Sequence, residues 1–140
     1  IRIAAEGARF AAVWVKRGLI PDGGATYLMP QLLGMSKALE LMYTGDIINA
    51  REAERIGMVS KVVRATELMD SAKEMANRIA KGPPIAMQLI KRGAYKTLYE
   101  RLEAQLEFES YGQNICRSTE DHKEGVRSFM EKRKPKFKGR

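Results

Sequence analysis

Two residue types that build many functional sites are almost missing from this 140-residue chain, which has one cysteine, Cys116, and one histidine, His122. An internal disulfide is therefore impossible, and no set of cysteines and histidines has the spacing of a structural zinc site. A Ser-His-Asp triad would have to use His122. No apolar run approaches the ~18 residues of a membrane span, and no secretory leader pattern opens the chain. The sequence thus argues against disulfide scaffolds, zinc modules and membrane-spanning proteins.

Acidic residues are scarce at the C-terminal end. The whole chain has 25 Lys and Arg against 17 Asp and Glu, which gives a net charge of +8. Its 44% hydrophobic and 30% charged residues are ordinary for a single domain of this length. Residues 123–140 hold eight basic and two acidic side chains, which leaves only +2 for the first 122 residues. The positive charge is local, which favours a phosphate-bearing partner over a broad nucleic-acid surface.

The first part of the chain has mixed signals. Strands are expected over residues 1–5, 8–10 and 58–63, and helices over 25–33, 37–43, 50–56 and 67–80. We expect residues 11–20 to be extended or irregular. Asn49 and Thr66 are the predicted N-caps of the third and fourth helices.

The rest of the chain has only helical patterns, over residues 85–100, 101–115 and 120–132, the last capped by Ser118 or Thr119. Two or three short strands cannot form a covered sheet, so the first part is interpreted as the end of a larger α/β core. The sequence predicts a fragment with two regions. Residues 1–81 belong to the α/β core, and residues 82–140 form an all-helical region for oligomerisation with a basic tail.

One turn stands out as a place for chemistry: Pro21-Asp22-Gly23-Gly24, directly before a predicted helix. A carboxylate there, close to Leu19 and Trp14, can serve as a general acid or base. Asp22 is equally a preferred helix N-cap, with the glycines completing the turn. The residues alone leave both interpretations open.

Five segments stand out as motifs: Ala8-Arg9-Phe10, Gly18-Leu19-Ile20-Pro21-Asp22-Gly23-Gly24, Leu39-Glu40-Leu41-Met42-Tyr43-Thr44-Gly45, Glu52-Ala53 with Ile56-Gly57-Met58-Val59, and the ending from Glu124-Gly125-Val126 to Phe137. Together they resemble the motifs of the enoyl-CoA hydratase/isomerase (crotonase) family. The matches run through the whole chain in order, and they correspond to the C-terminal half of a family domain. The resemblance implies the family's fold, a spiral of β-β-α turns followed by a helical trimerisation region.

The resemblance also implies a reaction. Family members bind acyl-CoA thioesters and stabilise an enolate with two backbone N–H groups. Those donors, and the first glutamate of the hydratase pair, align before Ile1, so this fragment is expected to lack the oxyanion hole. Trp14 aligns with the second hydratase glutamate, which counts against hydration. Asp22 aligns with the catalytic aspartate of family isomerases, and an aspartate beside a tryptophan also occurs in the family's 4-chlorobenzoyl-CoA dehalogenase.

The resulting prediction is an enoyl-CoA isomerase that moves a double bond by proton transfer, with Asp22 as the catalytic residue. The predicted substrate-binding residues are Trp14, Leu19, Pro21, Gly23, Phe129 and Lys132. Phe129 and Lys132 are expected one helical turn apart, with Lys132 suited to a CoA phosphate. Their alternative roles are a core position for Phe129 and a solvated basic end for Lys132.

The other expectations are an acyl-CoA thioester as substrate, no metal, no cofactor besides the CoA of the substrate, and no nucleic-acid or membrane partner. A homotrimer or homohexamer in the cytoplasm is expected, with organellar targeting left open because the chain begins at Ile1. Two alternatives remain: an enoyl-CoA hydratase, and a non-catalytic oligomerisation or RNA-binding fragment. His122 is expected to face solvent, Cys116 to pack near the helical core, and Met42, Met69, Met75, Met87 and Met130 to fill cores.

Overall fold

The computed structural model describes residues 1–139, with the side chains of all of them except 97, 99 and 100. It forms two compact units that interleave along the sequence. Unit 1 comprises Ile1–Phe10 and Ile48–Leu102, and unit 2 comprises Ala11–Ile47 and the chain from Glu103 onward. None of the helices among these described residues is long and apolar enough to cross a membrane. These units are not the two regions predicted from the sequence, which divide the family core from its helical region after residue 81. That division stays a prediction.

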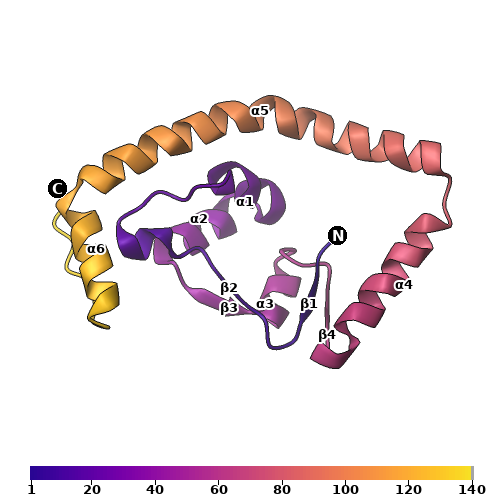
Figure 1. Ribbon diagram of the computed structural model, residues 1–140, viewed down its shortest axis with the longest axis horizontal. Helices are drawn as coiled ribbons and strands as arrows, with labels where there is room; N and C mark the ends of the chain where they lie inside the picture. Colours follow the sequence, from indigo (N-terminus) through magenta and orange to yellow (C-terminus); the bar gives the residue numbers. More distant parts are fainter. Residues whose placement is uncertain (140) are drawn as a thin grey trace. The chain divides into compact units, whose positions relative to one another are not determined.

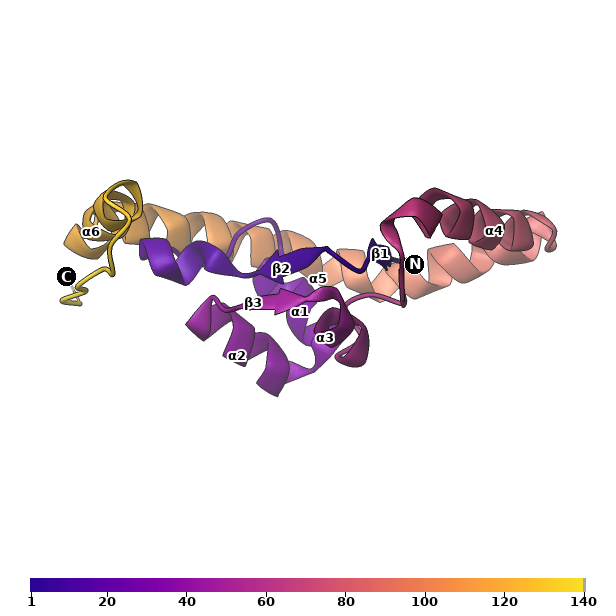
Figure 2. The same ribbon diagram turned by 90° about the horizontal axis from the view of Figure 1, so that it is seen from below.

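Unit 1 contains a short parallel strand pair. Strand β1 (Ile3–Ala5) pairs with β4 (Lys61–Val63), with Ala4 opposite Val62. Strand β2 (Arg9–Ala11) pairs with β3 (Ile47–Asn49), and Figure 2 shows the two side by side. The sequence predicted β1, β2 and β4 to within a few residues but gave no signal for β3, which is three residues long.

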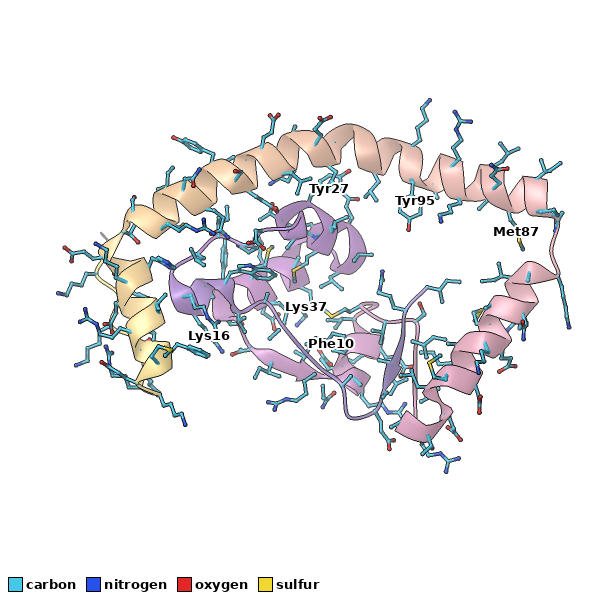
Figure 3. The ribbon with its side chains drawn as sticks, in the orientation of Figure 1. Phe10, Lys16, Tyr27, Lys37, Met87 and Tyr95 are labelled. Atoms are coloured by element: carbon cyan, nitrogen blue, oxygen red, sulfur yellow. The ribbon has the colours of Figure 1, made fainter. Side chains whose placement is uncertain are left out.

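Helix α3 (Ala50–Arg55) begins where the sequence predicted. The Asn49 side chain accepts a hydrogen bond from the backbone N–H of Glu52, at 2.9 Å, so Asn49 is the N-cap. The inner face of α3 is built of alanines, which lets the helix lie close to the strands. The resulting core consists of Ala4, Ala50, Ala53, Val59 and Val62, and Phe10, labelled in Figure 3, packs against it.

Helix α4 (Leu68–Ala80) starts later than expected. A 3-10 turn, η2 (Ala65–Glu67), precedes it, and no side chain caps its first N–H groups, so the prediction of Thr66 as the N-cap was wrong. The prediction that methionines fill cores holds for Met42, which is buried, but not for Met69 and Met130, which are 63% and 74% exposed.

Unit 2 begins with a 3-10 helix, η1 (Val13–Arg17), in the segment that was expected to be extended or irregular. Gly18, at φ +63°, ends it. Helices α1 (Ala25–Leu33) and α2 (Met35–Thr44) follow and pack side by side, as Figure 1 shows. Their core contains the buried Ala12, Ala38 and Met42, with Trp14, Met29 and Leu39 packed against it.

Helix α5 (Pro84–Ser118) is continuous over 35 residues (Figures 1 and 2), although the sequence pattern predicts a break at residue 100. Neither glycine nor proline occurs there, and the residues on both sides are good helix formers, so nothing stops the helix. Its Pro84 stands at the first helical position, where a missing N–H costs nothing.

Helix α6 (Glu120–Met130) is capped by Thr119, whose hydroxyl accepts a hydrogen bond from the His122 N–H at 3.0 Å. This confirms one of the two predicted caps. The helix ends two residues before the expected end, and Lys132 adopts a left-handed conformation at φ +53°. Phe129 and Lys132 therefore do not share a helical face, and that prediction was wrong.

Candidate active site

The candidate site is built on the turn that precedes α1. Gly23 and Gly24 have φ values of +64° and +80°, two successive left-handed residues that only glycine adopts without strain. Gly24 is itself the N-cap of α1, and no side chain of the turn caps the helix. Asp22 contributes only its backbone carbonyl, which accepts a hydrogen bond from the Ala25 N–H at 3.1 Å. The Asp22 carboxylate is thus not the helix cap.

The Asp22 carboxylate is instead held between two donors, both in unit 2. The Trp14 indole Nε1–H donates to Oδ1 at 3.0 Å, and the Gln113 amide Nε2–H donates to Oδ2 at 3.2 Å. Each carboxylate oxygen therefore has one protein donor, while the side chain stays exposed to solvent. An oriented carboxylate that a small molecule can reach has the geometry required of a general base.

Trp14 lies in η1 and links the site to the core of unit 2. Its ring packs against the buried cluster around Ala38, and its carbonyl accepts a hydrogen bond from the Leu19 N–H at 3.1 Å. Because an indole N–H can only donate, it suits a carboxylate oxygen. The structure thus brings the predicted Trp14 and Asp22 together, and Leu19 and Pro21, both half-buried, lie in the segment between them.

Helix α5 supplies a second carboxylate beneath the turn. Glu109 is 1% exposed and accepts hydrogen bonds from the backbone N–H groups of Gly24, at 2.6 Å, and Thr26, at 2.9 Å. The Thr26 hydroxyl also donates to it at 2.6 Å, and accepts in turn from Gln105 Nε2 at 2.5 Å. The free N–H groups at the start of a helix need acceptors, and here a distant residue provides them.

Sequence reasoning missed the residues of α5 that contact the turn. Gln105, Glu109 and Gln113 recur every four residues, so they lie along one side of the helix. Glu109 and Gln113 are buried, at 1% and 6% exposure, whereas the neighbouring Phe108 and Tyr111 are largely exposed. A polar stripe at helical spacing, flanked by apolar residues, was the available signal.

Helix α6 packs closely on η1. His122 Nδ1 lies 2.9 Å from the carbonyl oxygen of Arg17, so this nitrogen carries the proton, and the ring is half-buried rather than facing solvent as predicted. The Arg17 guanidinium lies 4.4 Å above the Phe129 ring, a cation–π contact. Phe129 is 61% exposed, so its alternative interpretation as a core residue was wrong.

The sequence model of the enoyl-CoA hydratase/isomerase family matches residues 1–140. The chain belongs to this family. It is 43% identical over 134 residues to a short-chain-enoyl-CoA hydratase of Clostridium acetobutylicum, covering 96% of this chain and 51% of that protein. It is 36% identical over 140 residues to the 1,2-epoxyphenylacetyl-CoA isomerase of Escherichia coli, covering 100% of this chain and 53% of that protein.

The solved structures agree. An enoyl-CoA hydratase/isomerase from Pseudoalteromonas atlantica superposes with a TM-score of 0.89 at 31% identity, over 97% of this chain and 55% of that one. The family and the fold class, part of a crotonase-like α/β core followed by helices, are therefore confirmed. The chain spans about half the length of the curated relatives it matches.

The basic end of this family member forms a cavity of about 660 Å³ between α6 and the tail that follows it. Its lining includes six basic residues: Lys123, Arg127, Arg133, Lys134, Lys136 and Lys138. Arg133 donates from its two terminal guanidinium nitrogens to Glu124, at 2.5 and 2.8 Å. This contact, and to a smaller extent a hydrogen bond from the Lys136 N–H, lowers the pKa of Glu124 to about 2. Lys132 is exposed and connects α6 to this tail.

Metal binding has no support in the part of the chain that the structure describes. No three His, Cys, Asp or Glu side chains are grouped there as metal ligands require. Glu109 and Glu124 already have partners, since Glu109 binds the α1 turn and Glu124 binds Arg133.

Proposed function

We propose that the protein is an acyl-CoA enzyme that moves a carbon–carbon double bond by proton transfer, with Asp22 as the base. The observation that carries this proposal is the exposed Asp22 carboxylate, which is not the helix cap and has one donor on each oxygen. A base must be fixed in direction and open to its substrate, and Asp22 meets both requirements.

The proposed reaction needs a single carboxylate. Asp22 removes a proton from the carbon that lies between the double bond and the thioester carbonyl, and the C–H electron pair moves toward the thioester oxygen as an enolate forms. The same proton then returns to the far carbon of the double bond, whose π electrons form the new C–H bond, while the enolate electrons restore the carbonyl and form the new double bond next to it. No oxidant, metal or second substrate is required. The enolate needs hydrogen-bond donors, which the resemblance places outside these 140 residues, so we propose that this segment alone is a poor catalyst.

The residues around Asp22 are assigned to substrate binding. We assign Leu19 and Pro21 to the wall beside Asp22, and Gly23 to a close approach of the acyl group to backbone, because Gly23 is exposed and has no side chain. Trp14 flanks the carboxylate. Phe129 and Lys132, near the cationic tail, are proposed for the CoA moiety, where a lysine can pair with a phosphate. Coenzyme A is then part of the substrate, and no further cofactor is proposed.

Hydration of an enoyl-CoA is the second candidate function, since the relative at 43% identity is named a hydratase. A hydratase uses two carboxylates to position and activate water. Here the indole of Trp14 contacts Asp22 where the resemblance places one of those carboxylates, and an indole N–H cannot accept a proton. This observation favours isomerisation. A non-catalytic oligomerisation or RNA-binding role is the remaining alternative.

We also propose that the protein is a homotrimer or a homohexamer of two trimers. Helix α5 leaves large apolar side chains exposed, among them Ile85, Leu89, Ile90, Phe108 and Tyr111. Such surfaces on one chain usually mark contacts with a partner, and closed rings are a common result. A cytoplasmic location belongs to the same proposal, and cell fractionation tests it.

Asp22→Asn in the full natural protein tests the function. Asparagine keeps the size and one acceptor oxygen, its amide nitrogen takes the place of the other oxygen, and the base is lost. Turnover of a β,γ-unsaturated acyl-CoA should fall at least ~100-fold, while the Kd for the acyl-CoA changes little. Asp46→Asn, an exposed aspartate outside the turn, is the control. Unchanged turnover in Asp22→Asn would refute the assignment, and hydration of a crotonyl-type thioester as the faster reaction would favour the hydratase.

A further inference from the structure

We propose that Gln113, on helix α5, is a positioning residue whose side-chain amide orients the Asp22 carboxylate. This inference rests on the proposed function, because orienting Asp22 matters for catalysis only if Asp22 is the base. The two residues are 91 positions apart in the sequence, so no local pattern around the turn points to this pair.

The contacts fix which way the Gln113 amide faces. Its Nε2 lies 2.7 Å from the carbonyl oxygen of Ile20 and 3.2 Å from Oδ2 of Asp22, and both of these are acceptors. Only the amide nitrogen can donate to them, so a flipped amide would place oxygen against oxygen. Gln113 thereby connects the backbone before the turn to the carboxylate on it.

The cost of this arrangement indicates a role beyond stability. Gln113 is 6% exposed, and its Oε1 is buried without a hydrogen-bond partner among the described residues. An unpaired buried carbonyl destabilises a folded protein by more than an average hydrogen bond contributes. An apolar residue of the same length would avoid that cost, but it would leave Oδ2 of Asp22 without its donor.

The backbone around Gln113 is also fitted to the turn. An added Cβ on Gly112 would lie 3.0 Å from Cδ1 of Ile20, so the lack of a side chain at 112 lets α5 approach the segment. One helical turn earlier, Glu109 holds the N–H groups of Gly24 and Thr26. Glu109 therefore fixes the turn, and Gln113 fixes the direction of the side chain on it.

A double-mutant cycle in the full natural protein tests this inference, with turnover of a β,γ-unsaturated acyl-CoA as the readout. Gln113→Met keeps length and removes the donor. We expect kcat to fall about 10- to 100-fold with KM within about 2-fold, because a misdirected base slows the chemical step and leaves binding intact. The variant Asp22→Asn/Gln113→Met should be no slower than Asp22→Asn alone, because Gln113 acts through Asp22. Asn114→Leu, at the neighbouring exposed amide, is the control.

Two results would overturn the inference while Asp22→Asn remains inactive: wild-type kcat in Gln113→Met, or losses that multiply in the double variant, as for an independent structural role. Active Asp22→Asn would overturn the proposed function itself. Thermal unfolding checks that each variant folds. If Gln113→Met does not fold, Gln113→Asn, which withdraws the amide by one methylene, is put through the same cycle with the same two outcomes.

Discussion

Glu109 shows at the scale of a single residue how α5 stabilises the turn. Its carboxylate accepts three hydrogen bonds, two of them from backbone N–H groups at the start of α1. Glu109→Gln keeps the shape but turns an amide N–H toward one of these donors. We expect the free energy of unfolding to fall by about 1–3 kcal/mol, the cost of unpaired buried donors. Denaturant unfolding measures this difference.

The matched control is Glu107→Gln, which makes the same change at an exposed position of the same helix. Its free energy of unfolding should stay within about 0.5 kcal/mol of the wild type. Equal effects of the two changes would show that the Glu109 contacts contribute nothing specific.

Among the contacts around the turn, the sequence predicted only that Trp14 lies close to Asp22. Asp22 and Trp14 could be found because the turn has a strong local signal and the resemblance aligns both residues. Glu109 and Gln113 could not be placed, since their partners lie 83 to 93 residues earlier in the chain. The alternative interpretation of Asp22 as the helix cap was wrong, because the carboxylate of the distant Glu109 accepts hydrogen bonds from the N–H groups at the start of α1.

At the scale of elements, the contact between α6 and η1 depends on the absence of a side chain at Gly125. An added Cβ would lie 2.7 Å from both Cα and the carbonyl carbon of Arg17, which is too close for any real contact. Gly125→Ala should therefore push α6 away from η1 and lower the free energy of unfolding by about 1–3 kcal/mol, despite the better helix propensity of alanine.

Gly93→Ala is the informative control because it makes the same change within α5, where no atom apart from the adjoining helix backbone lies within 4 Å of the added Cβ. Here alanine should raise the free energy of unfolding by about 0.5–1 kcal/mol through helix propensity. Thermal and denaturant unfolding compare the two variants. Stabilisation by Gly125→Ala would mean that α6 does not pack on η1 as described.

The tail after α6 should detach from it in acid. The Arg133 side chain and the Lys136 N–H lower the pKa of Glu124 from its ordinary 4.5 to about 2. A carboxyl with a lowered pKa in the folded state stabilises that state above pH 4.5, and its contribution is lost as the pH falls from 4.5 to 2. The NMR shift of the Lys136 amide should titrate with a midpoint near 2. Glu124→Gln should abolish this titration, whereas a midpoint near 4.5 would contradict the contact.

Element boundaries were predictable where a local signal marks them. Helix α1 matches its expected range because glycines stand at both of its ends, and α3 because Asn49 caps it. The wrong boundaries occur where no local signal marks the start or end of an element. Helix α5 was divided at residue 100 without a helix breaker, and η1 was missed because a single 3-10 turn has no periodic pattern of its own.

At the scale of the whole molecule, the exposed apolar residues of α5 predict association. Ile90→Glu places a charge among them, since Ile90 is 69% exposed and Leu89 beside it is 60% exposed. Burying an unpaired carboxylate in an interface is costly, so Ile90→Glu should shift the full natural protein toward monomers in multi-angle light scattering, with unchanged helical content by circular dichroism. Lys91→Glu adds the same carboxylate at the next exposed position, which is not apolar, and should leave the assembly intact.

The free energy of unfolding of the monomeric variant should then depend less on protein concentration than that of the wild type, because association stabilises only the assembled form. An unchanged mass for Ile90→Glu, or a monomeric wild type, would show that this face of α5 does not mediate association.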